Sequence, residues 1–266
     1  MILVAPNPVL IQIGPLAIRY YGLVYALGFL AIYWYLAQLS KHKRLKLSID
    51  QIETFLIYSI LGTIIGGRIG EFIFYQTNTL LSNPIQIFKI WQGGMSFHGA
   101  IIGIIITTIL FCRKNKINFY TLIDHLVLPG ALILVFGRIT NFINAELIGR
   151  VTNVSWCVNW FGERTINRDL VCRHPSQLYE AFKNFVIFGT LYFMQYSLKG
   201  KPLKKKYKPG YFTWIFILMY GVLRAITNIW REDTLTIFGV LSTGQALSSL
   251  MAITALIILY KNYWKK

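Results

Sequence analysis

Acidic side chains, and charged side chains in general, are scarce in this sequence. Its 266 residues include 10 Asp and Glu, and charged residues of both signs make up 14% of the chain. Soluble domains carry about 25% charged residues, so this composition excludes an ordinary soluble domain. Several apolar runs approach or exceed the ~20 residues that a helix needs to cross a bilayer, whereas β-barrel strands are about half as long and alternate in polarity. The sequence therefore predicts an all-α, polytopic transmembrane helical bundle.

Signals for metal binding, secretion and internal repetition are also missing. No spacing of Cys and His is typical of a zinc site, so no metal site is predicted. The first 17 residues contain no Lys or Arg, and a cleavable signal peptide needs a positive start, so none is predicted. Because no repeat or separate soluble domain stands out, we expect a single integral-membrane domain over 1–266, with an external loop region around 140–175.

Cysteine is rare, with three residues in the whole chain. Cys112 ends an apolar run beside a basic cluster, and we expect it to stay reduced at the cytoplasmic face. Cys157 and Cys172 lie in the longest polar connection. An external disulfide between them and two free thiols are both compatible with the sequence, because sequence alone does not fix the geometry that a disulfide needs.

Seven apolar segments are predicted to cross the membrane. They cover residues 18–39, 52–75, 97–111, 122–139, 178–196, 211–229 and 238–260. Basic clusters follow the first, third, fifth and seventh segments, and their members are Lys41, Lys43, Arg44, Lys46, Arg113, Lys114, Lys116, Lys199, Lys201, Lys204, Lys205, Lys206, Lys208, Lys261, Lys265 and Lys266. If every segment crosses, these clusters share one side, which the positive-inside rule makes cytoplasmic. The amino terminus is therefore predicted to be periplasmic and the carboxyl terminus cytoplasmic.

The net charge of +17 would by itself suggest a nucleic-acid partner. Its distribution argues against one, because most lysines lie in short clusters between apolar runs, where orientation signals belong. The remaining basic residues are mainly arginines, namely Arg19, Arg68, Arg138, Arg150, Arg164, Arg168, Arg173, Arg224 and Arg231. A planar guanidinium suits bidentate binding of phosphate or carboxylate. We therefore expect arginine–anion chemistry in the outer half of the protein, with ordinary salt bridges accounting for some of these residues.

The densest group of polar residues lies at 137–150, at the outer end of the fourth predicted span. Arg138 is an ionisable residue at a membrane boundary, where such residues are costly and usually functional. Asn141, Asn144 and Glu146 add hydrogen-bond donors and acceptors nearby, and the glycines of the segment permit close backbone approach. The alternative interpretation is a snorkelling arginine followed by a polar loop.

Three further groups lie near span ends. Gln177 and Glu180 share a face at the start of the fifth span. Arg224 and Arg231 lie seven residues apart, about two helical turns, near the end of the sixth. Tyr21 lies early in the first span, where tyrosine commonly acts as an interfacial anchor.

The second and third spans also carry ionisable residues. Arg68 and Glu71 lie three apart, so they either form a structural ion pair or contact a ligand. His98 follows a Gly-Gly pair at the start of the third span and could relay a proton, although a lone histidine is more often a structural hydrogen-bonding residue. By topology, His98, Arg138 and Arg231 are expected near the same outer membrane boundary, as an anionic-lipid site requires.

Five blocks of the sequence resemble the prolipoprotein diacylglyceryl transferases and occur in the family's order. They are residues 20–22, 66–70, 93–99, 137–150 and 174–180. The resemblance covers nearly the whole chain and implies a seven-helix enzyme of the bacterial inner (cytoplasmic) membrane, with its active site toward the periplasmic half. It implies transfer of the sn-1,2-diacylglyceryl group of phosphatidylglycerol to the lipobox cysteine of a prolipoprotein signal peptide, which is the first step of lipoprotein maturation. A thioether forms, glycerol 1-phosphate leaves, and no cofactor is needed because the nucleophile belongs to the substrate.

The resemblance also implies roles for individual residues. Arg138 and Arg224 match the family's essential arginines and are expected to bind the phosphate and to stabilise it as it departs. His98 matches a histidine proposed as the base for the thiol, although arginines could instead lower the pKa of that thiol. Tyr21 is grouped with these catalytic residues. The predicted substrate-binding residues are Asn141, Glu146, Gly149, Arg231, Arg68 and Gln177.

Three positions depart from the family pattern. Thr140 and Ala145 stand where glycine is usual, which adds side chains at tight places. Asn228 stands where related enzymes often carry glutamate, four residues after Arg224. A carboxylate there could pair with Arg224, whereas asparagine can support it only by hydrogen bonding.

Two other classes of function compete with the enzyme. A transporter or channel with an outward-facing anion site would also place arginines in the membrane, but it commonly shows inverted repeats, and none is visible here. A scaffold that binds membrane lipids without chemistry would tolerate loss of His98 and Tyr21 as long as the arginines stayed.

Overall fold

The computed structural model describes residues 2–4, 8–14, 16–160, 171–198, 203, 207–232, 236–237 and 241–265. Its α-helices are α1 (Tyr20–Lys41), α2 (Ile49–Phe74), α3 (Thr77–Ser82), α4 (Phe97–Lys114), α5 (Phe119–Ile143), α6 (Ser176–Tyr196), α7 (Tyr211–Thr227) and α8 (Thr243–Leu259). Among the described residues, six helices are long and apolar enough to cross a membrane, namely α1, α2, α4, α5, α7 and α8. The predicted polytopic helical membrane protein is thereby confirmed.

The number of crossing helices and the sides of the two termini stay predictions. α6 has 21 residues, but charged side chains at Glu180 and Lys183 lower its apolar character. Several basic residues named above lie outside the described part of the chain, and they are Arg164, Arg168, Lys199, Lys201, Lys204, Lys205, Lys206 and Lys266.

Most helix boundaries differ from the predicted ones by a few residues, and the largest differences are at the end of α5 and at the start of α8. α5 continues to Ile143 instead of ending at 139, so Asn141, which lies beyond the predicted span, is on its last turns together with Arg138. α8 begins at Thr243 instead of 238. There Ser242 Oγ accepts from the N–H of Gln245 at 3.1 Å, while the Gln245 side chain accepts from the N–H of Ser242 at 3.0 Å. This capping box satisfies donors that a helix start leaves unpaired.

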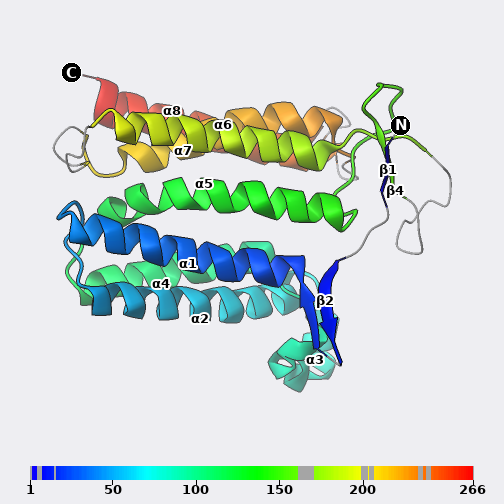
Figure 1. The fold of residues 1–266 in the computed structure, drawn as a ribbon, viewed down its shortest axis with the longest axis horizontal. Helices are drawn as coiled ribbons and strands as arrows, with labels where there is room; N and C mark the ends of the chain where they lie inside the picture. The colour runs from blue at the N-terminus through cyan, green and yellow to red at the C-terminus, as the bar shows by residue number, and fades with distance from the viewer. Residues whose placement is uncertain are drawn as a thin grey trace. The chain divides into compact units, whose positions relative to one another are not determined.

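The chain divides into two compact units, 1–32 with 123–266, and 33–122. In the first unit, α7 lies between and alongside α6 and α8 (Figure 1). Asp124 of α5 fixes the start of α7, because its carboxylate accepts from the N–H of Gly210 at 2.7 Å and of Thr213 at 2.8 Å. A buried carboxylate at this position caps the helix and complements its dipole.

Short strands connect the helices of the first unit. β2 (Val9–Ile13) pairs antiparallel with β3 (Leu16–Arg19), β1 (Ile2–Val4) pairs parallel with β4 (Val158–Trp160), and β5 (Thr236–Ile237) pairs antiparallel with β6 (Leu241–Ser242). Cys157 and Cys172 form a disulfide, with Cα atoms 5.5 Å apart, which decides between the two states that the sequence left open. Cys112 is free and buried.

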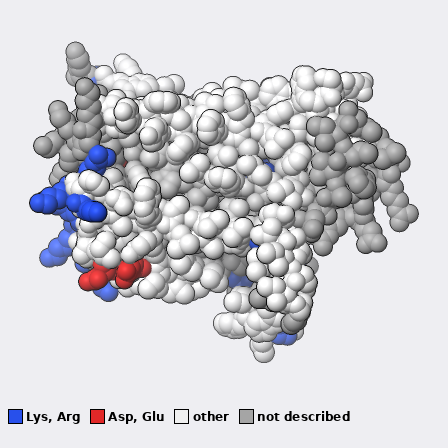
Figure 2. All heavy atoms as spheres, in the orientation of Figure 1, with Lys and Arg blue, Asp and Glu red and all other residues white. Residues whose placement is uncertain are grey.

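In the second unit, α2 and α4 lie side by side (Figure 1). Glycines make this close packing possible, because a Cβ on Gly66 would lie under 3.0 Å from the backbone of Gly99 and Gly103. The connection from α2 to α4 contains α3, η1 (Pro84–Phe88) and η2 (Ile90–Gln92). Figure 2 shows Lys and Arg gathered where α1 ends and α2 begins, and a largely uncharged visible surface along the helices.

Candidate functional site

A hydrogen-bonded group joins the start of α1 to the end of α5 in the first unit. The Tyr21 hydroxyl donates to Glu146 Oε2 at 2.5 Å. Asn141 Nδ2 donates to the Tyr21 hydroxyl and to Glu146 Oε2, the latter at 3.0 Å. Asn144 Nδ2 donates to Glu146 Oε1 at 3.2 Å. Three of the predicted site residues are therefore brought together: Asn141 and Glu146, which are close in the chain, and Tyr21, which is distant from both.

The turn that carries Glu146 has an unusual backbone. Ala145 and Leu147 both have φ +54°, a left-handed conformation that costs a residue with a side chain about 1–2 kcal/mol. Glycine adopts it freely, so glycine is the relaxed choice at position 145. Thr140 causes no such problem, because it is buried in α5 and its hydroxyl donates to the Phe136 carbonyl at 3.1 Å.

Glu180 on α6 lies at the centre of a second group, which contains both predicted catalytic arginines. Its Oε1 accepts from Arg224 Nη1 at 2.6 Å and from the Thr227 hydroxyl. Its Oε2 accepts from Lys183 Nζ at 2.8 Å and lies 3.7 Å from Arg138 Nε. Two helices besides α6 thus supply cations to one carboxylate: α5 through Arg138, and α7 through Arg224.

The charges of this group do not balance. Arg138, Arg224 and Lys183 carry three positive charges and Glu180 one negative charge, so the group has a formal excess of two positive charges. The carboxylate and the lysine side chain are 4% and 2% exposed, whereas Arg138 and Arg224 keep 16% and 12%. Unbalanced charge is costly in a weakly solvated setting. A bound anion that reached both arginines would reduce that cost.

Arg138 links the two groups. Its Nη1 donates to Asn141 Oδ1 at 3.3 Å, and Asn141 in turn contacts Tyr21 and Glu146. An anion held by Arg138 would therefore have the Tyr21–Asn141–Glu146 group as its neighbour. The geometry can bind a phosphate through guanidinium groups and place hydrogen-bonding side chains beside it.

Gln177 and Gly149 support the loop after α5. Gln177 is 1% exposed, and its Nε2 donates to the Glu146 carbonyl at 2.6 Å. A Cβ on Gly149 would lie under 3.0 Å from the carbonyl oxygens of His174 and Trp230. These two predicted site residues hold backbone in place, and contact between either of them and a substrate stays a prediction.

Arg231 lies at the same junction. Its carbonyl accepts from Arg150 Nε at 3.0 Å, and the N–H of Arg150 donates to the Trp230 carbonyl at 2.9 Å. Arg173 is 7% exposed, and its Nη1 donates to the Gly149 carbonyl at 3.1 Å and pairs with Glu232. Arg150 and Arg173 thus connect neighbouring loops of the first unit. The ion pair of Arg173 with Glu232 is one of the ordinary salt bridges that we expected among the arginines.

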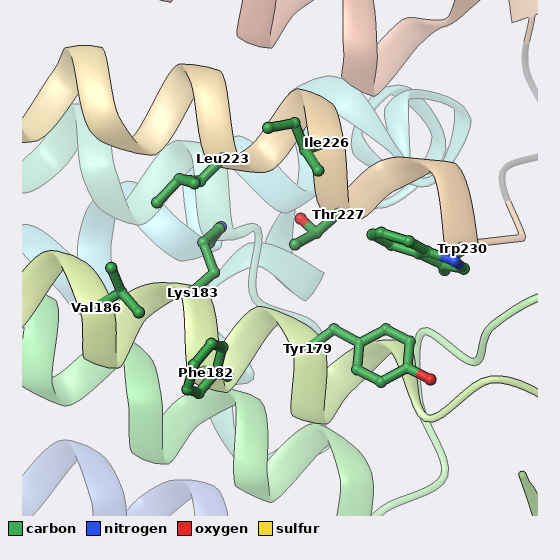
Figure 3. A pocket seen from close by; sticks show the side chains of 8 residues that line it. All are labelled: Tyr179, Phe182, Lys183, Val186, Leu223, Ile226, Thr227 and Trp230. Atoms are coloured by element: carbon green, nitrogen blue, oxygen red, sulfur yellow. The ribbon is translucent and has the colours of Figure 1, made fainter. Parts of the chain in front are cut away.

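A groove of about 300 Å³ lies between α6 and α7. Figure 3 shows Lys183 and Thr227 between the two helices, with Tyr179 and Trp230 near one end. The rings of Tyr179 and Trp230 meet edge to face, with centroids 5.7 Å apart. The rest of the lining is apolar, so Lys183 and Thr227, which both contact Glu180, separate an apolar surface from the charged group.

Arg68 in the second unit has a different environment. Its Nε donates to the Ile87 carbonyl at 2.8 Å, and Nη2 donates to the Gln86 and Lys89 carbonyls at 2.7 and 3.0 Å. Nη1 donates to the carbonyls of Gly93 and Gly94. Every N–H direction of the guanidinium therefore has a backbone acceptor, and a role for Arg68 in substrate binding stays a prediction.

The alternative Arg68–Glu71 ion pair is not formed within the described part of the chain. Glu71 instead accepts from Gln76 Nε2 at 3.1 Å. His98 lies exposed on the first turn of α4, which Ser96 caps by accepting from the N–H of Gly99 at 3.2 Å. The proximity of His98 to Arg138 stays a prediction.

Sequence reasoning missed the partner of Arg224. The sequence pattern placed the possible partner four residues after Arg224, at position 228, where this chain has asparagine instead of a carboxylate. The structure supplies the carboxylate from α6, as Glu180, while Asn228 Nδ2 donates to the Ser242 hydroxyl. The available signal was the position of Glu180 inside the 174–180 block, three residues before Lys183.

Comparisons with known proteins match this chain over most of its length to one family of membrane enzymes. Residues 8–261 match the family model described as prolipoprotein diacylglyceryl transferase. The phosphatidylglycerol–prolipoprotein diacylglyceryl transferase of Rickettsia africae is 43% identical over 246 residues, which cover 91% of each chain. The enzymes of the same name from Rickettsia typhi and Rickettsia bellii are 41% and 38% identical, over 94% and 96% of this chain and 95% of each relative.

Proposed function

This chain belongs to the prolipoprotein diacylglyceryl transferase family, and we propose that Arg138 and Arg224 hold the phosphate of its lipid substrate. The protein is a multi-pass membrane enzyme that transfers a diacylglyceryl group from phosphatidylglycerol to a prolipoprotein. One observation carries the assignment of the site: two partly exposed arginines share a single carboxylate with a buried lysine. That leaves two positive charges to be balanced by a ligand.

The acceptor in the proposed reaction is the thiol of the lipobox cysteine. Its sulfur attacks the terminal glyceryl carbon of the diacylglyceryl group, so a carbon–sulfur bond forms as the carbon–oxygen bond to phosphate breaks. Glycerol 1-phosphate leaves with the electron pair of the broken bond. Negative charge grows on the departing phosphate, and guanidinium groups fixed beside it stabilise that charge more than they stabilise the bound substrate.

Tyr21, Asn141 and Glu146 position the lipid headgroup in this proposal. They contact one another, and Asn141 also accepts from Arg138 at 3.3 Å, so they line the neighbourhood of the phosphate. The glycerol of phosphatidylglycerol offers two hydroxyl groups, which can donate to Glu146 and accept from the tyrosine or the amide. Gly149, Gln177 and Arg231 act indirectly, by holding the loops that carry these groups.

The proton of the attacking thiol has two proposed routes. His98 accepts it in the first, which requires the start of α4 to lie beside the phosphate site. In the second, the surplus positive charge of Arg138 and Arg224 lowers the pKa of the thiol, which then reacts as a thiolate. His98→Gln distinguishes the two routes. The histidine is favoured if this variant loses activity and if the rate that remains no longer follows the ionisation of the thiol as the pH changes.

The proposed location is the bacterial inner membrane, with the site in its periplasmic half. The positive-inside pattern of the lysine clusters supports this orientation. A cysteine-reactive probe that cannot cross membranes tests it. The variant combines Cys112→Ser with Arg150→Cys at an exposed position, so position 150 carries its one free cysteine beside the Cys157–Cys172 disulfide. Labelling of intact spheroplasts is expected, and labelling only after lysis would place the site on the other side.

The central experiment supplies the purified protein with phosphatidylglycerol and a peptide that contains a lipobox cysteine. Release of glycerol phosphate and a diacylglyceryl mass gain on the peptide are expected together, and both should be lost in Arg138→Ala. Arg113→Ala, an exposed arginine at the end of α4, is the matched control. Neither product from the wild-type protein, under conditions where the Rickettsia africae enzyme yields both, would reject the enzyme and favour a transporter or lipid-binding scaffold.

A further inference from the structure

Lys183 is the most deeply buried cation of the Glu180 group. Its side chain is 2% exposed, and its ammonium lies 4.0 Å from the centroid of the Tyr220 ring. A cation over an aromatic face gains attraction from the ring quadrupole. The ammonium is therefore held in place between Tyr220 of α7 and its own carboxylate partner, Glu180.

The two oxygens of Glu180 are used differently. Oε1 accepts from Arg224 at 2.6 Å and from Thr227. Oε2 accepts from Lys183 at 2.8 Å, while Arg138 Nε stays 3.7 Å away, beyond the 2.7–3.2 Å of an N–H···O hydrogen bond. Lys183 is thus the hydrogen-bond donor at the Glu180 oxygen that lies nearest to Arg138.

We infer that Lys183 is a positioning residue that keeps Arg138 free for the phosphate. Without its ammonium, Oε2 would be a buried anionic oxygen with no hydrogen-bond donor, which is costly. Arg138 Nε needs to move by only about 1 Å to satisfy it. That movement would draw the guanidinium toward α6, away from Asn141, and would neutralise part of the charge that the phosphate needs.

This inference rests on the proposed function and predicts a specific change in kinetics. Lys183→Met removes the charge and keeps a long unbranched side chain. We expect the KM for phosphatidylglycerol to rise about tenfold, equivalent to ~1.4 kcal/mol, and kcat to fall beside it, because the captured arginine binds the phosphate less well both in the bound substrate and in the transition state. The KM for the peptide should stay unchanged.

The test is a double-mutant cycle with Glu180→Gln in detergent-solubilised protein. Once Glu180 is uncharged, no carboxylate remains to capture Arg138, so adding Lys183→Met should change the KM for phosphatidylglycerol less than about twofold. The same tenfold rise in both backgrounds, or no rise in the wild-type background, would overturn the inference.

Two further measurements separate this outcome from others. Thermal unfolding of each variant shows whether it folds, and Lys183→Leu, which likewise leaves Oε2 without a donor, replaces Lys183→Met if the latter does not. Lys183→Arg restores a cation to Oε2 and should return the KM to within about threefold of wild type. Transfer by the wild-type protein establishes the proposed function independently, so an inactive wild type and an unaffected Lys183 variant are distinguishable results.

Discussion

Arg138 and Arg224 in the first unit and Arg68 in the second are all arginines on long apolar helices, yet their donors are used in opposite ways. Arg68 donates to five backbone carbonyls. Within the described part of the chain, Arg224 donates one hydrogen bond, to Glu180, and Arg138 donates one, to Asn141. Among these residues, the first arrangement uses every N–H of the guanidinium, and the second uses a minority of them.

The difference extends to the charge that surrounds each arginine. Carbonyl oxygens carry partial negative charge and solvate a guanidinium completely, so Arg68 needs no counter-ion. Glu180 faces three cations at once, and in our proposal the lipid phosphate supplies a further anion. Under that proposal, the acceptors of an arginine distinguish a functional arginine from a structural one, and its burial does not.

The largest expected effect comes from changing Arg138 to Lys. An ammonium keeps the charge but loses the planar fork that binds two phosphate oxygens, so kcat/KM should fall at least ~100-fold. The free energy of unfolding should change by less than about 1 kcal/mol, since Arg138 makes one hydrogen bond. Enzymatic transfer and thermal unfolding measure the two quantities, with Arg113→Lys as the control. Wild-type activity in Arg138→Lys would mean that the planar fork of Arg138 is not needed, and Arg138 could then no longer be contrasted with Arg68 as the arginine that binds phosphate.

Changing Arg68 to Met should give the opposite pattern. Five carbonyls between Gln86 and Gly94 lose their donor, and we expect the free energy of unfolding to fall by about 3 kcal/mol. The kcat/KM of the protein that remains folded should stay within about threefold of wild type. The opposite result, full stability with a raised KM for phosphatidylglycerol, would show that Arg68 binds substrate, as the sequence predicted.

The sequence predicted the class of the fold and some of the contacts within the candidate site, for reasons that differ by residue. Apolar runs fix membrane helices almost without regard to tertiary context, and the 137–150 block brought Arg138, Asn141 and Glu146 together because they are near in the chain. The pairing of Arg224 with Glu180 joins two helices across 44 residues, and no local pattern specifies it. The acceptors of Arg68 are backbone carbonyls, which sequence does not distinguish from one another.

A smaller effect is expected at Gly149, whose backbone packs closely against the loops beside the proposed phosphate site. Alanine there would press against the carbonyl oxygens of His174 and Trp230, so the unfolding free energy should fall by about 2 kcal/mol. Gly130→Ala is the control, since nothing lies within 4 Å of a Cβ built there. Equal stability of the two variants in thermal unfolding would mean that the loop moves aside without cost.

The smallest effect concerns the turns that shape the two regions. Near Arg68, the backbone residues with positive φ are glycines, Gly93 at +80° and Gly94 at +81°. In the turn before Glu146, the residue with positive φ is an alanine, Ala145 at +54°. Ala145→Gly should therefore raise the free energy of unfolding by about 0.5 kcal/mol, because relief of the left-handed strain exceeds the entropy that glycine adds to the unfolded chain.

The same substitution on a regular helix should have the opposite sign. Ala31→Gly, at an exposed position of α1, is expected to lower the unfolding free energy by about 1 kcal/mol. Thermal unfolding of the pair isolates the backbone term, since neither change touches a charged group. A loss of stability in both variants would mean that the Ala145 methyl group contributes packing worth more than the strain, and glycine would then be the poorer residue at a turn where the family usually has it.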